Sequence, residues 1–193
     1  MIKLKADIFE YVGQCVDAGE RVSVLLPMSS YRKRSGEAVM GAGVLRRFCE
    51  RFPHAPTALG VKLPPVPEHD MYCNAGASGA ITDGVDFSGV NVCAWLIQPR
   101  LGFASDVYPH LAERFGVIAG EDMDEEQPDI PGWACTPWQS AIRASISGIA
   151  QLRGRVVIPY PNLGGRMSND AFNEEMSILS DSVTLLTGTG GAR

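Results

Sequence analysis

Two glycine-containing turns in the sequence stand where a negatively charged ligand could reach the main chain. Gly41-Ala42-Gly43 leads directly into an amphipathic helical pattern, and Gly164-Gly165 follows the strand-like run VVIPYP. A helix N-terminus exposes unpaired N–H groups and carries about half a positive charge, so phosphates bind there. Glycine permits close approach because it has no side chain. Either turn alone could simply end a strand, because glycine is common in such turns. The two turns together favour a site for two linked phosphates.

The common nucleotide-binding and metal-binding motifs are absent. No G-x-x-x-x-G-K-[ST] loop occurs, and Gly43 is followed by Val44-Leu45-Arg46 instead of the spacing of the G-x-G-x-x-G fingerprint. The cysteines are odd in number and widely spaced, with no C-x-x-C pair, which argues against a disulfide framework or a zinc site. We therefore expect no metal and no cofactor, and free buried thiols at Cys15, Cys49, Cys73, Cys93 and Cys135.

The length and amino-acid composition of the chain indicate one globular domain. The chain has 193 residues, of which 45% are hydrophobic and 20% are charged, so it can bury a full core. The formal net charge of -5 argues against a general nucleic-acid binder. No apolar run approaches the ~20 residues that a membrane-spanning helix needs, and the N-terminal segment lacks the apolar stretch of a signal peptide. We expect a cytoplasmic protein without a membrane partner.

Helical and strand patterns alternate along the chain. Amphipathic spacing predicts helices over 7–18, 44–52, 136–153 and around 172–179, and apolar runs predict strands over 21–30, 90–97, 155–161 and 182–188. Thr136 and Pro137 give the third of these helices the clearest start. The weak alternation of 57–63 suggests an edge strand. Together the pattern predicts a three-layer α/β/α sandwich with a mixed, largely parallel central sheet.

Four segments resemble the macrodomain family. MGAGVLRRFCERFP is similar to its MG-[AK]-G-[IL]-A-x-x-F-[KR]-x-x-F segment, and VVIPYPNLGGRMSNDAFNEEM to its second loop and helix. KADIF is similar to G-D-[IL]-[FL], with Ala6 in place of the glycine, and VCAWLIQPR lies where the family has a strand. The resemblance is closest to the branch that contains terminal ADP-ribose protein glycohydrolases and antitoxins that reverse DNA ADP-ribosylation. It implies a single domain over 1–193, with 64–90 and 101–132 as loop insertions.

The resemblance implies binding of ADP-ribose, or a related ADP-ribosyl nucleotide, in a cleft between the two turns. Asp7 would accept a hydrogen bond from the adenine amino group, and Ile8 would contact the ring. The distal ribose and the diphosphate would be lined by Met40, Gly41, Ala42, Gly43 and Val44. The opposing phosphate loop would consist of Leu163, Gly164, Gly165, Arg166 and Met167.

The sequence departs from the family pattern at the positions that perform hydrolysis. The family's lysine would follow AWLI, where this chain has Gln98-Pro99-Arg100, and its acidic position falls on Ser168. Asp170 is the remaining catalytic candidate, although an acid near a helix start also serves the helix dipole. We therefore expect binding without hydrolysis, with an ADP-ribosyl hydrolase acting on protein or nucleic acid as the alternative. The basic stretch 31–34 leaves a third alternative, an interaction module for nucleic acid or an ADP-ribosylated partner that binds no nucleotide.

Overall fold

The computed structural model describes residues 1–29, 32–33, 35–41, 43–64, 79–98, 138–160 and 169–187. Within these ranges the chain forms a six-stranded sheet in the order β1-β6-β5-β2-β4-β3. The strands are β1 (Ile2–Lys5), β2 (Val22–Ser29), β3 (Val85–Phe87), β4 (Val90–Gln98), β5 (Arg155–Pro159) and β6 (Val183–Thr187). All neighbouring strands are parallel except β3 and β4, which form an antiparallel hairpin.

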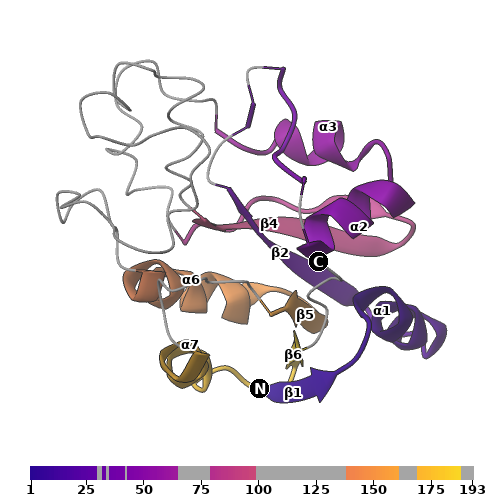
Figure 1. Ribbon diagram of the computed structural model, residues 1–193. Coiled ribbons are helices and arrows are strands. Elements are labelled where there is room, and N and C mark those ends of the chain that lie inside the picture. The colour runs from indigo at the N-terminus through magenta and orange to yellow at the C-terminus, as the bar shows by residue number, and fades with distance from the viewer. Residues whose placement is uncertain are drawn as a thin grey trace, which may run out of the picture.

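Helices cover both faces of this sheet (Figure 1). One face packs against α1 (Ile8–Asp17), α2 (Gly43–Arg51) and α3 (Ala55–Gly60), and the other packs against α6 (Trp138–Gln151) and α7 (Asn169–Met176). The side chains of β2 alternate between the two cores, with Val24 and Leu26 in the first and Leu25 in the second. The three-layer α/β/α sandwich expected from the sequence is confirmed.

Most of the expected elements are present, and three short ones differ from the sequence prediction. The segment 57–63, expected as an edge strand, lies largely in α3, because Ala55, Leu59 and Leu63 repeat every four residues and bury one helical face. The interval 64–90, expected to be a loop insertion, is not all loop, since β3 and the first residue of β4 fall within it. β1 was not expected as a strand. The proposed cap Thr136 and the interval 101–132 lie outside the described residues.

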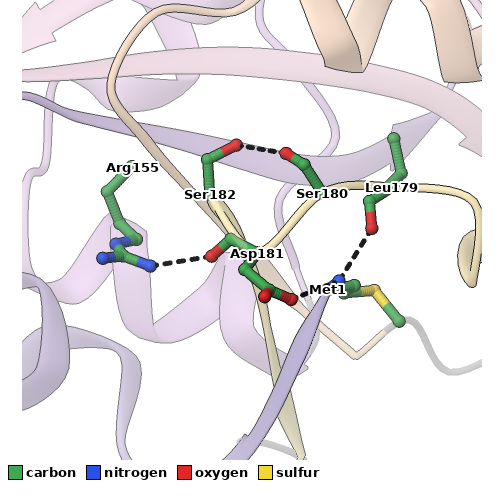
Figure 2. Close-up of polar contacts among 6 residues, drawn as sticks. All are labelled: Met1, Arg155, Leu179, Ser180, Asp181 and Ser182. Atoms are coloured by element: carbon green, nitrogen blue, oxygen red, sulfur yellow. Dashed lines mark hydrogen bonds and ion pairs between the residues drawn. The ribbon is translucent and has the colours of Figure 1, made fainter.

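Polar contacts hold β1 at the edge of the sheet (Figure 2). The Met1 amino group donates to the carbonyl of Leu179 at 2.7 Å and lies 3.2 Å from a carboxylate oxygen of Asp181. The Arg155 guanidinium donates to the main-chain carbonyl of Asp181 at 3.0 Å and pairs with Glu20. The turn between α7 and β6 is thereby tied to both β1 and β5, which fixes where β1 pairs and where α1 begins.

Candidate functional site

The strand order of the sheet reverses between β2 and β5. These two strands are parallel neighbours, with Val22–Val24 paired to Arg155–Val157. The chain leaves β2 towards α2 on one face and continues to β3 and β4, whereas from β5 it leads to α7 on the other face and on to β6. In open α/β sheets, ligands bind at such points, where the strand order reverses.

The first glycine turn lies between β2 and α2 and is anchored to the core behind it. Met40 is buried, and its carbonyl accepts a long hydrogen bond from the Cys49 thiol at 3.6 Å. Gly41 is exposed, and Gly43 begins α2 in the left-handed region with φ of +53°. Val44 is half-buried and packs against the first core cluster. The anchored side chains therefore flank a glycine main chain that faces solvent.

The first turn of α2 offers main-chain N–H groups to an anion. Ala42, which precedes the helix and lies outside the described residues, has no side-chain acceptor that could cap it, and the first turn contains no acidic residue. A Cβ atom built on Gly41 or on Gly43 would meet no described atom within 4 Å. As far as the described residues are concerned, an anionic group has room to approach these N–H groups.

α3 supports the segment that leads to this turn. The N–H of Ala38 donates to the carbonyl of Pro56 at 2.7 Å, and Ala38 itself is fully buried. Gly60 packs so closely on the segment that an added Cβ would lie 2.1 Å from the carbonyl oxygen of Gly36. Sequence reasoning missed this support, although Gly60 inside a helical stretch was a signal of close packing.

Asp7 caps the start of α1 and pairs with a residue of α2, the helix that follows the glycine turn. One carboxylate oxygen accepts hydrogen bonds from the main-chain N–H groups of Phe9 at 2.9 Å and Glu10 at 3.3 Å, and the other pairs with Arg47. Arg47 lies one helical turn after Gly43, so this pair joins the start of α1 to the middle of α2. Ile8 is buried in the first core cluster.

The partners of Asp7 determine its ionisation. Partial burial by itself would raise its pKa, but the hydrogen bond and charge of Arg47 and the N–H groups of Glu10 and Phe9 outweigh this and hold the pKa below its usual value. Asp7 and Arg47 lie 40 residues apart in the chain, so no local sequence pattern indicates that they pair. Both side chains remain about one-third exposed, so the carboxylate is also within reach of a ligand.

Asp7→Asn is expected to lower the free energy of unfolding at neutral pH by about 0.5–1 kcal/mol, because asparagine keeps the helix cap and loses only the partly screened ion pair. Since the folded-state pKa of Asp7 is depressed, its contribution is present above the unfolded pKa and is lost as pH falls through the folded value. Urea unfolding of both proteins from neutral pH to below about pH 4 measures this. A difference that persists undiminished in acid would contradict the assignment.

Several expected site residues cannot be placed relative to these. Leu163, Gly164, Gly165, Arg166 and Met167 lie outside the described residues, so the second glycine turn stays a prediction. The main chain of Asp170 lies in the first turn of α7, and its side chain is not described, so its catalytic role is likewise a prediction.

The described residues hold neither a candidate metal cluster nor a reactive thiol. No group of three or more His, Cys, Asp or Glu side chains in the described ranges is arranged to bind a metal ion. Cys15, Cys49 and Cys93 are free, and burial raises the pKa of each thiol. Raised pKa values leave these groups protonated at neutral pH, which makes them poor nucleophiles.

Comparison with other proteins adds no identity to these observations. In the part of the chain that the structure describes, no helix is both long and apolar enough to cross a membrane. Searches with protein-family models, among curated proteins and among solved structures find no match to this chain. The proposed function therefore depends on the geometry and chemistry of the candidate site.

Proposed function

We propose that the chain binds ADP-ribose, or a related ADP-ribosyl nucleotide, at the carboxyl edge of β2 and β5. The observation that carries the proposal is the glycine main chain at the start of α2, where the first turn has no acidic residue and a Cβ built on Gly41 or Gly43 meets no described atom within 4 Å. A helix N-terminus preceded by glycine favours the binding of a phosphate, which supports the proposal. The nearby carboxylate of Asp7 supplies an acceptor for a donor group on the same ligand, such as an exocyclic amine.

A diphosphate fits better than a single phosphate because of the sheet order. β2 and β5 are adjacent and parallel, so the segments that follow them leave the same edge of the sheet side by side. The second turn, Gly164-Gly165, begins five residues after the end of β5. Two turns on neighbouring strands would contact two linked phosphoryl groups, which is the arrangement that the macrodomain resemblance implies.

Calorimetric titration with ADP-ribose, AMP and NAD tests the proposal. ADP-ribose is expected to bind most tightly, and AMP more weakly because it lacks the second phosphate. A ligand that binds only the folded chain also raises the thermal midpoint, which gives an independent readout. Absence of heat and of any thermal shift with all three nucleotides at up to about 1 mM, an affinity of roughly -4 kcal/mol, would refute nucleotide binding.

The same protein distinguishes binding from the two alternatives. Because Gln98-Pro99-Arg100 replaces the family lysine, ADP-ribosylated protein or DNA is expected to bind without releasing ADP-ribose. Arginine does not readily deprotonate and therefore is a poor general base. Release of ADP-ribose would show the hydrolase instead. Salt-dependent binding to nucleic acid without nucleotide binding would show the interaction module.

A further inference from the structure

A hollow lies on the face of the sheet that α1, α2 and α3 cover. It is bounded by α1, the C-terminal half of α2 and the β3–β4 hairpin. Its volume is about 160 Å³. We call it the phenylalanine groove, because four phenylalanines contribute to it. Phe48 and Phe87 are almost fully buried, and Phe9 and Phe52 are half-buried. The groove is open to solvent, so these rings are reachable by a small molecule.

The four rings pack against one another and form an aromatic wall of the groove. Centroid distances are 6.2 Å between Phe9 and Phe48, 5.1 Å between Phe48 and Phe87, and 5.3 Å between Phe52 and Phe87, with parallel, tilted and edge-on orientations among them. These separations are those of favourable aromatic pairs. An apolar cavity of about 150 Å³ is large enough to hold benzene, so the groove matches the size of one aromatic ring.

Gly13 keeps the groove open. It lies in the middle of α1 and lines the groove, and a Cβ there would meet no described atom within 4 Å. Glycine in a helix interior costs about 1 kcal/mol relative to alanine. The chain therefore has a destabilising residue at a position of α1 where a side chain would narrow this hollow.

The charges at the two ends of the groove are opposite. The Arg51 guanidinium lies 5.2 Å from the ring centroid of Phe9 and 5.9 Å from that of Phe52, and it has no ion-pair partner among the described residues. Asp17 lines the other end, at the C-terminus of α1. The carboxylate and the helix dipole both repel anions there. An anionic group on a ligand would therefore be directed to Arg51.

From ring size, open rim and charge, we propose that the phenylalanine groove binds a small aromatic carboxylate, with its single ring among the phenylalanines and its acid group on Arg51. A guanidinium and a carboxylate form two parallel hydrogen bonds, so the acid group fixes the orientation of the ring. The groove extends from Ile8, the residue expected to contact the adenine ring, along α1 to Asp17 and across to the second half of α2, and neither Gly41 nor Gly43 lines it.

Titration of the full chain with benzoate, benzylammonium and toluene tests this, with the phenylalanine ring resonances as the NMR readout. Benzoate is expected to bind saturably, at least about tenfold more tightly than benzylammonium. Arg51→Gln should remove most of that preference and leave toluene binding unchanged. Arg46→Gln, which removes the same charge from the same helix outside the groove, should keep the preference.

A second variant tests occupancy without relying on charge. Gly13→Leu is expected to abolish the binding of benzoate and toluene without lowering the thermal midpoint, because leucine fills the groove and favours the helix. The proposal is overturned if benzoate gives no saturable shift up to about 10 mM, if Arg51→Gln retains the preference for benzoate, or if Gly13→Leu binds benzoate like the unaltered protein.

Discussion

Gly60→Ala is expected to lower the free energy of unfolding by about 2–3 kcal/mol, although alanine is the better helix former. The added Cβ would lie 2.1 Å from the carbonyl oxygen of Gly36 and 2.8 Å from the main-chain nitrogen of Ala38. Both are main-chain atoms, so neither can move aside by rotating a side chain. α3 and the segment before the glycine turn must separate, which strains the hydrogen bond between Ala38 and Pro56.

Gly13→Ala is the matched control for this prediction. It is the same substitution inside a helix, at a position where the new Cβ meets no described atom within 4 Å. It should raise the free energy of unfolding by about 0.5–1 kcal/mol. If packing decides the outcome, urea denaturation will show a lower free energy of unfolding for Gly60→Ala and a higher one for Gly13→Ala. Two changes of the same sign would show that α3 does not pack on Gly36 in this way.

Gly41→Val is expected to weaken the binding of ADP-ribose by about a hundredfold or more, equivalent to roughly 2.7 kcal/mol. Gly41 is exposed and its φ is not in the left-handed region, so the valine side chain enters open space with little backbone strain. That space is where the phosphate would lie. Calorimetry measures the affinity, and urea denaturation should show stability close to that of the unaltered protein. Unchanged affinity would mean that no phosphate approaches this turn.

Gly43→Val should also abolish binding, but it needs a control for strain. Gly43 has a φ of +53°, a conformation that a β-branched residue adopts only at a cost of about 1–2 kcal/mol. Gly19→Val is the control for this strain, because Gly19 also has a positive φ, of +77°. Gly19 follows the C-terminal end of α1, away from Asp7, and a Cβ there also meets no described atom within 4 Å. Both variants should lose similar stability, and only Gly43→Val should lose ADP-ribose binding. Loss of binding in both would point to strain as the cause.

The sequence was a good guide wherever an element is long enough to show its period. α1, α2 and α6 and the buried strands β2 and β4 follow from repeats of apolar residues over eight or more positions. The five-residue strands β5 and β6 were also predicted, from their apolar runs, whereas β1, β3 and α3 were not. β1 has four residues, all exposed, and β3 has three, so neither contains enough of an alternating pattern. α3 has six residues, and only its packing against the core shows that it is helical.

In the candidate site, too, some features could be predicted from the sequence and others are seen only in the tertiary structure. That Gly43 opens a helix and that Asp7 lies at the start of another are local properties, because caps and turns depend on a few neighbouring residues. The sequence by itself therefore determined the chemistry of each segment. Which segments meet depends on strand pairing and helix packing between residues far apart in the chain. Only the tertiary structure decided that β2 lies beside β5 and that Asp7 pairs with Arg47, because the non-local contacts that place them leave no short-range pattern in the sequence.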